Sequence, residues 1–188
     1  MILSGRKDLF RFELPKVFIP AEVKRRWMPY LERQPLSIDD VSGLVNYSVQ
    51  SITVPNFNFQ PVEQVKPGNS ERARGTTRSW RASMSPEMLI DRQFTVTMKM
   101  LDGYVNYWIM LETFFSYYAF ERKEPFLYDM ALRITDTEGN VMYTVVFHDA
   151  LYTGLSEFNL SYNELEADLT TFDASFSFNE MTVRFDEG

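Results

Sequence analysis

Residues 172–185, with the sequence FDASFSFNEMTVRF, decide the fold class of this 188-residue chain. Their apolar side chains first occupy even positions and then odd ones: Phe172, Ala174, Phe176 and Phe178, followed by Met181, Val183 and Phe185. Alternation with a period of two is typical of a β-strand with one buried face. The change of phase at Asn179–Glu180 predicts either a β-bulge or a strand that leaves one sheet for another.

The same alternation occurs earlier in the chain. Residues 93–100 place every second residue, from Phe94 to Met100, on one apolar face, which predicts a half-buried strand. Two further alternating runs, 126–134 and 141–147, flank the turn sequence Asp136-Thr-Glu-Gly-Asn140 and predict a β-hairpin. Residues 8–14 alternate weakly, and residues 49–54 are expected to be extended. The chain is therefore expected to be mainly β.

One strong helix is expected among the strands. Asp102 is a candidate N-cap, and the apolar residues from Tyr104 to Phe120 cover more than one stripe of the helix. A helix with so much apolar circumference should pack on the sheet or in a contact between subunits. Two shorter helical segments are expected earlier, one opened by Pro20 and one capped within Ser37–Asp40.

The composition fits one globular domain over residues 1–188. Hydrophobic residues make up 45% and charged residues 24%, and 16 Phe, 10 Tyr and 3 Trp supply a core. The absence of cysteine excludes disulfides, zinc–thiolate sites and thiol nucleophiles. The N-terminal residues 1–7 contain no apolar stretch long enough for a signal peptide, and the longest apolar region is interrupted by Asn106, Glu112 and Ser116. We therefore expect no signal peptide or membrane span and a soluble protein made in a reducing compartment.

The net charge of −7 is divided unevenly along the chain. Residues 1–92 contain 14 Lys/Arg and 10 Asp/Glu, whereas residues 93–188 contain 5 and 16. The overall acidity argues against nucleic-acid binding by the whole surface. The asymmetry is expected when one surface of a subunit meets the acidic surface of a neighbour, which leaves self-association open.

Two long segments, 56–67 and 68–78, are expected to form loops or an exposed hairpin arm. A basic and aromatic cluster lies at their end and places Trp80 among Arg72, Arg74, Arg78 and Arg81. Such a cluster can grip phosphate, or it can form salt bridges from an arm to an acidic neighbour. The flanking chain is not basic, which favours the second interpretation.

Patterns that carry catalysis are absent from the sequence. His148 is the only histidine, and we expect it to be hydrogen-bonded at a strand end. The carboxylates form one cluster: Glu157, Glu164, Glu166 and Asp168. A solvated acidic loop is favoured over a glycosidase pair or a calcium site, and an acidic lining for the passage of a polyanion is a third interpretation. With no glycine-rich phosphate loop and no H-E-x-x-H motif, we expect a non-enzyme without metal or cofactor.

The order of the expected elements resembles the tail-tube proteins of tailed bacteriophages, especially those with contractile tails, and the related inner-tube proteins of type VI secretion. The resemblance rests on the strand RQFTVTMKM (92–100), followed directly by a helix, and on the final strand TFDASFSF (171–178). It covers residues 42–185 and the first strand at 9–14. Residues 15–41 depart from the family pattern and are expected to be an insertion.

This resemblance implies a mainly β, α+β fold: an antiparallel β-sandwich or half-barrel with one packed α-helix and a long extended hairpin arm. It also implies stacked hexameric rings with a continuous inner β-barrel, an arm at residues 56–80 that contacts the adjacent ring, and an acidic lumen that conducts the genome. The implied inter-ring residues are Arg72, Arg74, Arg78 and Arg81. The lumen candidates are Asp173, Ser175, Ser177 and Asn179.

The function implied by the resemblance is that of a virion structural protein, the tail-tube subunit, assembled in the host cytoplasm without membrane insertion. The expected partners are copies of the chain, the tail sheath, the baseplate and tail-terminator proteins, and the DNA that passes through. Alternatives with the same fold are a baseplate or neck ring that starts or ends the tube, and the inner tube of a contractile injection apparatus. Outside this class, the alternative is a small β-barrel ligand-binding module or hydrolase that uses the carboxylates between Glu157 and Asp168.

Overall fold

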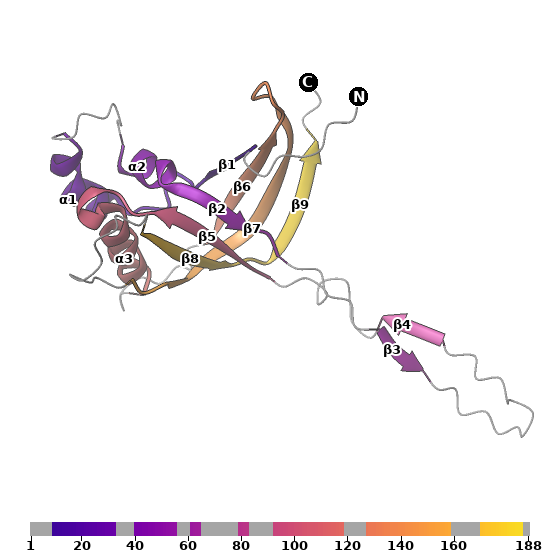
Figure 1. Cartoon of the computed structure of the whole chain (residues 1–188). Helices are drawn as coiled ribbons and strands as arrows, with labels where there is room; N and C mark the ends of the chain where they lie inside the picture. The colour runs from indigo at the N-terminus through magenta and orange to yellow at the C-terminus, as the bar shows by residue number, and fades with distance from the viewer. Residues whose placement is uncertain are drawn as a thin grey trace, which may run out of the picture. The chain divides into compact units, whose positions relative to one another are not determined.

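The computed structural model describes residues 9–32, 40–55, 61–64, 79–82, 92–118, 127–158 and 170–185. The chain divides into two compact units, one formed by residues 1–54 and 93–188 and the other by residues 55–92. The elements of the first unit, apart from its short 3-10 turn, are labelled in Figure 1. They are β1 (Phe10–Glu13), α1 (Ala21–Leu31), α2 (Val41–Tyr47), β2 (Val49–Thr53), β5 (Gln93–Lys99), the 3-10 turn η2 (Asp102–Tyr104), α3 (Val105–Tyr118), β6 (Tyr128–Thr135), β7 (Val141–Leu155), β8 (Thr171–Ser177) and β9 (Glu180–Phe185).

β6 and β7 form the hairpin that the sequence predicts, with Leu132 opposite Val145. The turn between them is stabilised by Asp136, whose carboxylate accepts hydrogen bonds from the backbone N–H groups of Glu138 and Asn140, both at 2.8 Å. These bonds favour the turn because they satisfy N–H groups that the strands leave unpaired. The predicted hairpin is confirmed, and β7 continues further along the chain than the alternation indicates.

β7 is bent, and its two parts belong to two halves of the sheet. Its first part, up to His148, pairs with β9, and its last part, from Leu151, pairs with β8. Between these parts Asp149 has a positive φ of 51°, and the register with β6 shifts. β8 and β9 are joined by a short turn at Asn179, where the chain passes from one half-sheet to the other. The change of apolar phase at Asn179–Glu180 thus marks a strand that leaves one sheet for another, the second of its two predicted causes.

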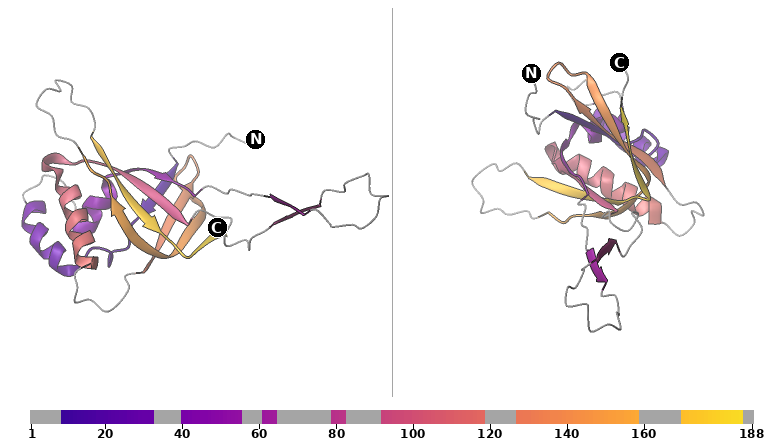
Figure 2. Two further views of the ribbon diagram at one scale, coloured as in Figure 1. Left: turned by 90° about the horizontal axis from the view of Figure 1, so that it is seen from below. Right: turned by 90° about the vertical axis from the view of Figure 1, so that its right-hand side faces the viewer.

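All paired strands are antiparallel. The β9 half-sheet consists of β1, β6, the first part of β7 and β9, and the β8 half-sheet consists of the last part of β7, β8, β5 and β2. Two further views show how the curved strands are arranged (Figure 2). The sheet is open, because the described residues of β1 and β2, its two end strands, do not pair. The expected mainly β, α+β fold is confirmed.

Aromatic rings fill the space between the two half-sheets. Phe94 of the β8 half-sheet stacks on Phe147 of the β9 half-sheet with 4.3 Å between ring centroids, and on Phe176 at 5.1 Å. Phe178, beside the corner, contacts both Phe94 and Phe147, and Phe12 of β1 meets Phe94 edge-on. Aromatic pairs contribute about 0.5–1.5 kcal/mol each beyond their burial. This cluster therefore joins the two half-sheets into one core.

The described α-helices gather at one end of the strands (Figure 1). Pro20 directly precedes α1, as the sequence predicts, and α1 lies within residues 15–41, the segment expected to be an insertion. Asp40 is the N-cap residue of α2, which confirms the short helix expected after Ser37–Asp40. The two hydroxyls of Tyr117 and Tyr118 tie α3 to its surroundings, because they donate to the carbonyl oxygens of Phe18 and Tyr152.

The start of α3 differs from the prediction. Asp102 is not an N-cap but the first residue of η2, whose N-cap is Leu101. Gly103 has a positive φ of 67°, which separates this turn from the α-helix. The connection is held instead by the buried amide of Asn106, which accepts the N–H of Leu101 at 3.0 Å and donates to the carbonyl of Lys99 at 2.8 Å. The Asn106 side chain thus bonds the backbone of the segment that enters the turn, a contact different from the N-cap expected of Asp102.

The second unit is described through one strand pair. β3 (Pro61–Gln64) and β4 (Ser79–Ala82) are antiparallel, with Val62 opposite Arg81 and Glu63 opposite Trp80. Most of this pair falls within residues 56–80, the segment expected to form the hairpin arm.

Candidate assembly surfaces

The β8 half-sheet has one apolar face and one polar face. Every second residue of β5 and β8 is buried against the core: Phe94, Val96 and Met98 on β5, and Phe172, Ala174 and Phe176 on β8. The opposite face carries mainly small polar side chains: Ser51 and Thr53 on β2, Gln93, Thr95, Thr97 and Lys99 on β5, and Thr171, Asp173, Ser175 and Ser177 on β8. We call these ten residues the polar face.

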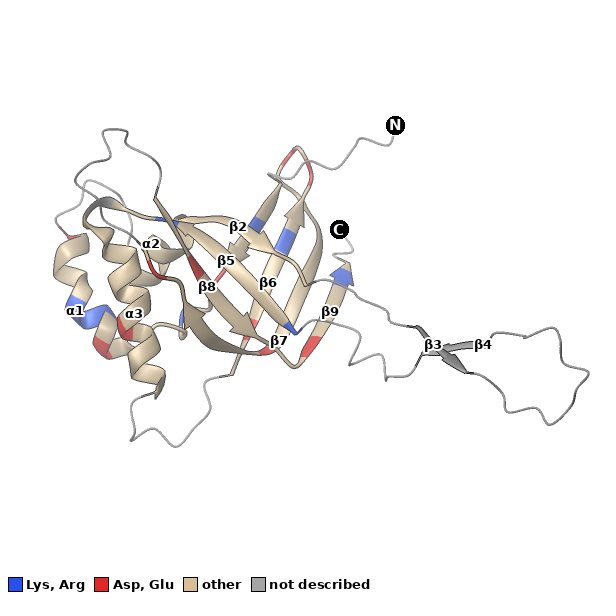
Figure 3. Cartoon of the chain, turned by 60° about the horizontal axis from the view of Figure 1, so that its bottom comes forward, with Lys and Arg blue, Asp and Glu red and all other residues tan. Residues whose placement is uncertain are grey.

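The strand register arranges the polar face in rows. Ser51, Thr97 and Asp173 form one row across β2, β5 and β8, and Thr53, Thr95 and Ser175 form the next. Hydroxyl side chains dominate both rows, and only Asp173 and Lys99 carry charge on the polar face. Figure 3 shows how few charged positions these strands hold. Such a surface stays hydrated and offers a polyanion little to bind.

Hydrogen bonds from the end of β7 fix the backbone beneath this face. The N–H of Asp173 donates to the hydroxyl of Ser156, and the N–H of Ser156 donates to the carbonyl of Asp173, both at 2.8 Å. The hydroxyl of Thr153 donates to the carbonyl of Ser175 at 3.1 Å. The register of β8 against β7 is therefore set by side chains as well as by strand pairing.

Three of the four lumen candidates lie together on the polar face: Asp173, Ser175 and Ser177. The fourth, Asn179, lies in the corner between β8 and β9. There its N–H donates to the carbonyl of His148 at 3.0 Å, and its amide donates to the carboxylate of Asp149 at 3.2 Å. Asn179 thus stabilises the corner, a position that alternation alone does not distinguish from a continued strand.

Both edges of the β8 half-sheet are unpaired within the described part of the chain. β2 pairs only with β5, and β7 from Leu151 onward pairs only with β8. The backbone N–H and C=O groups of an edge strand require partners, and an edge of this kind is a template for pairing with another chain. The two edges lie at opposite sides of the same four strands, which suits pairing between copies.

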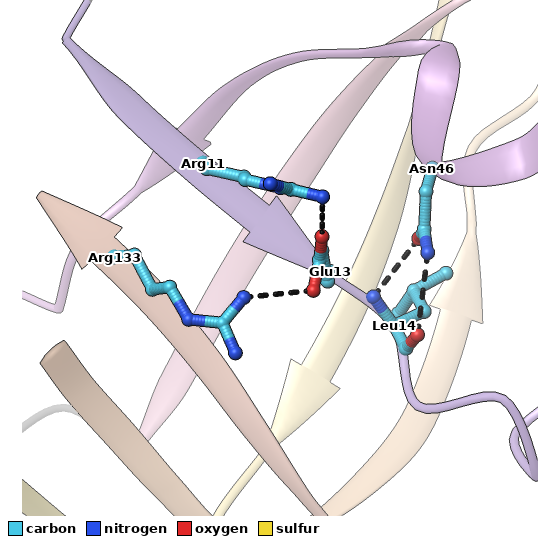
Figure 4. Close-up of polar contacts among 5 residues, drawn as sticks. All are labelled: Arg11, Glu13, Leu14, Asn46 and Arg133. Atoms are coloured by element: carbon cyan, nitrogen blue, oxygen red, sulfur yellow. Dashed lines mark hydrogen bonds and ion pairs between the residues drawn. The ribbon is translucent and has the colours of Figure 1, made fainter. Parts of the chain in front are cut away.

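The face of the β9 half-sheet that points away from the core is charged. Arg11 lies directly opposite Arg133 on the neighbouring strand, an arrangement of like charges that is unfavourable by itself. Glu13 compensates both, because its carboxylate lies 2.5 Å from Arg11 and 2.8 Å from Arg133 (Figure 4). Sequence reasoning missed this cluster, although the alternation of Arg11 and Glu13 with two phenylalanines is a sign of an exposed charged face.

A groove of about 470 Å³ lies beside this cluster, between the start of α2 and the charged face. Its charged lining mixes both signs: Glu13, Lys16, Asp40, Asp129 and Arg133. The Nζ atom of Lys24 lies 3.2 Å from the carboxylate of Asp40. Partial burial acts to raise the pKa of Asp40, but the hydrogen bond and charge of Lys24, with Ser42, outweigh it and leave this pKa below its ordinary value.

The lone histidine links three strands. The Nδ1 atom of His148 lies 3.2 Å from the carboxylate of Asp129 on β6, and Nε2 lies 2.8 Å from the hydroxyl of Thr182 on β9. His148 is hydrogen-bonded, as the sequence indicates, but it does not lie at a strand end, because β7 continues past it to Leu155. The described residues hold no group of three or more His, Cys, Asp or Glu able to bind a metal ion. Among the described residues, no helix combines the length and apolarity needed to cross a membrane.

The remaining predicted residues are mostly outside the described ranges: Arg72, Arg74, Arg78, Glu164, Glu166 and Asp168. Arg81 lies on β4. Glu157 is described, and it is exposed just after the end of β7.

No protein-family model and no curated protein matches this chain. Solved structures do. The tube terminating cap of the anti-feeding prophage (AFP) is 11% identical, with a TM-score of 0.58 over 98% of this chain and 93% of that chain. The sheath/tube terminator of the extracellular contractile injection system PVC, in its extended state, is 9% identical, with a TM-score of 0.51 over 72% of this chain and 84% of that chain.

The PVC sheath–tube complex in its extended state also matches, at 9% identity and a TM-score of 0.50 over 73% of this chain and 80% of that chain. At this identity the likeness concerns the fold. The chain therefore has the fold of these contractile-injection proteins, and the resemblance to a contractile tail-tube fold that the sequence predicts is confirmed.

Proposed function

We propose that the chain is a structural subunit of the tube of a contractile tail or injection particle and that it acts without catalysis. The observation that carries the proposal is the β8 half-sheet, whose two edges have no strand partner among the described residues, and which has an aromatic core on one face and the polar face on the other. Joining β2 of one copy to the last part of β7 of the next would pair both edges in every copy. A closed ring is the arrangement that leaves no edge exposed.

The size of such a ring suits the passage of a duplex or a folded cargo. Six copies of four strands, spaced about 4.8 Å apart and tilted by about 40°, enclose a channel roughly 40 Å across after allowance for side chains. The proposed wall is the polar face, so each ring would present six copies each of Asp173 and Lys99 among hydroxyls. This wall is hydroxyl-rich rather than strongly acidic, and its weak charge suits passive conduction of a genome without retention.

The hairpin arm supplies the proposed contact between rings. Arg72, Arg74, Arg78 and Arg81 belong to the basic part of the chain, and residues 93–188 carry the excess of carboxylates. Stacking in one direction would bring the arm of one ring to the acidic part of the next. The proposed partners are therefore copies of the chain, with the sheath, baseplate and terminator of the same particle.

A second candidate is a ring that ends the tube rather than one that builds it. The match to the AFP tube terminating cap extends over 98% of this chain and so includes residues 15–41, whereas the match to the PVC sheath–tube complex covers 73%. The match to the PVC terminator covers 72%, so this candidate rests on the AFP cap alone. A ring that builds the tube would repeat along it, whereas a ring that ends the tube would occur only at its end.

Negative-stain electron microscopy of the purified chain tests both roles. We expect rings with a central hole, which extend into tubes if the chain builds the tube and remain discrete if it ends one. A protein that stays monomeric at high concentration, by native mass spectrometry and by microscopy, would refute the proposal and favour the ligand-binding alternative.

A further inference from the structure

The last part of β7 directs some of its backbone groups away from the sheet. On the neighbouring strand, Asp173 and Ser175 make their backbone hydrogen bonds to the end of β7. The residues that alternate with them along β8 therefore point their backbone groups the other way, toward β5. Tyr152 and Leu155 lie opposite these alternate residues, so their own N–H and C=O groups point outward, away from β8. We call Tyr152 and Leu155 the β7 edge.

β2, on the opposite side of the same half-sheet, presents a matching edge. The N–H of Lys99 on β5 donates to the carbonyl of Ser48 at 2.7 Å, so Lys99 and every second residue before it point toward β2. Val49 and Ile52 lie opposite the residues between these and therefore point their backbone groups outward. We call Val49 and Ile52 the β2 edge. One β-bulge separates the two residues of each edge, so both edges space their outward groups alike.

A side chain already occupies the β7 edge. The hydroxyl of Tyr118, the last residue of α3, donates to the outward carbonyl of Tyr152 at 2.6 Å. A strand that paired along this edge would need the same carbonyl. Tyr118 is 49% exposed, and its ring packs separately on Phe114, with 4.6 Å between ring centroids. The hydroxyl can therefore leave the carbonyl for water while the ring keeps its packing.

We propose that Tyr118 covers the β7 edge of the free subunit and that the β2 edge of a second copy displaces it. The inference rests on the proposed function and adds the contact that is broken when copies join. Each strand from β2 through β5 and β8 to β7 is antiparallel to the one before it. The β2 edge of a copy in the same orientation therefore meets the β7 edge antiparallel.

The side chains at the two edges favour the same occupant. Val49 and Ile52 share the apolar face of their strands with the buried Met98 and Val96, and Leu155 shares it with Ala174. Pairing of the two edges would thus continue the apolar layer from one copy to the next, with the polar face continuous on the other side.

The strength of the cover suits a barrier against wrong partners. A neutral hydrogen bond changes an equilibrium constant by about threefold to tenfold. A strand that pairs along several residues regains more than one bond and overcomes this difference. A chance contact with a single bond does not, and exposed edge strands need such protection because they pair readily with other chains.

The test removes the covering hydroxyl and keeps the ring. Tyr118→Phe should lower the concentration for half-maximal ring formation by about threefold to tenfold, because the carbonyl of Tyr152 is then free for the arriving strand. Light scattering and negative-stain microscopy over a dilution series measure this concentration. The matched control is Tyr47→Phe, which removes a hydroxyl from a side chain that is 70% exposed beside β2. It should leave the concentration unchanged.

The outcomes separate the inference from the proposed function. If rings form and Tyr118→Phe assembles at the same concentration as Tyr47→Phe, or only at a higher one, Tyr118 is not a cover and the ring proposal stands. If neither variant nor the unchanged protein forms rings at any concentration, the inference and the proposed function both fail.

A second variant tests which strand arrives. Proline lacks an N–H, and the N–H of Ile52 points away from β5, so Ile52→Pro removes a donor that only the neighbouring copy would use. This variant should raise the concentration for half-maximal ring formation about tenfold or more, while the unassembled chain still unfolds cooperatively. Ring formation equal to that of the unchanged protein would overturn β2 as the occupant. If Ile52→Pro does not fold, the comparison of Tyr118→Phe with Tyr47→Phe decides alone.

Discussion

The side chain of Asn46 takes the place of a strand neighbour at the end of β1. Its Oδ1 atom accepts the N–H of Leu14 at 2.9 Å, and its Nδ2 atom donates to the carbonyl of Leu14 at 3.3 Å (Figure 4). These bonds tie β1 to α2, which leads into β2, so they join the two ends of the open sheet. Asn46→Ala would leave one backbone donor and one backbone acceptor of the buried Leu14 without a partner.

The cost of this change follows from those two groups. An unsatisfied buried polar group costs about 1–3 kcal/mol. Both bonds are only partly buried and one is long, so we take the lower part of this range for each group and expect a loss of about 2–3 kcal/mol in the free energy of unfolding. For a chain of this size, each kcal/mol shifts the melting temperature by about 2–4 °C, which predicts a decrease of about 5–10 °C.

Thermal and urea unfolding followed by circular dichroism measure both quantities. The matched control is Tyr47→Ala, the next residue of the same helix, whose side chain is exposed. It should change the free energy of unfolding by no more than about 0.5 kcal/mol. If Asn46→Ala melts within about 1 °C of the unchanged protein, the amide does not act as a strand substitute and the reasoning is refuted.

Further predictions concern a hydroxyl, a carboxylate and the arm. Within the described residues the buried hydroxyl of Tyr152 has no hydrogen-bond partner, so Tyr152→Phe should stabilise the fold by about 1 kcal/mol in urea unfolding; a loss of stability would show that the hydroxyl is bonded. The pKa of Asp40 is lowered in the folded state, so the stability that its carboxylate contributes is present above its ordinary pKa of 3.8 and is lost as the pH falls through the lower folded value. Asp40→Asn should therefore weaken the pH dependence of the free energy of unfolding in this acid range. An unchanged pH dependence would contradict the lowered pKa of Asp40. Deletion of Gly68–Arg78 should abolish ring stacking while the melting temperature is kept, and an unchanged distribution of tube lengths would show that the arm is assigned wrongly. Reversal of charge at Arg72 and Arg74 should weaken stacking, most strongly at low salt, whereas stacking that stays equal to the unchanged protein at every salt concentration would argue against the salt-bridging arm.

The strands were predictable because each has one buried face. The alternation from Phe94 to Met98 and from Phe172 to Phe178 follows directly from burial against a shared aromatic core, so the pattern is written in the sequence. The phase change at Asn179–Glu180 was predictable for the same reason. The bend of β7 at Asp149 was not predictable, because a single residue with positive φ leaves no periodic signal in the sequence.

Polar contacts between distant residues were the least predictable part. Asn46 and Leu14 are 32 residues apart, and neither residue type indicates the pairing. Asp102 was a reasonable cap by composition, but the buried Asn106 holds the start of α3 instead. The candidate lumen residues on β8 followed from alternation, whereas the face of β2 and β5 that completes the polar face required the strand register.

A cryo-electron microscopy reconstruction of the assembled protein tests the central claim most directly. The proposal predicts a closed ring in which β2 of each copy pairs with the last part of β7 of the next, and in which Thr97, Asp173 and Ser175 line the channel. A ring whose polar face points outward, or a copy whose β2 edge remains unpaired, would contradict it.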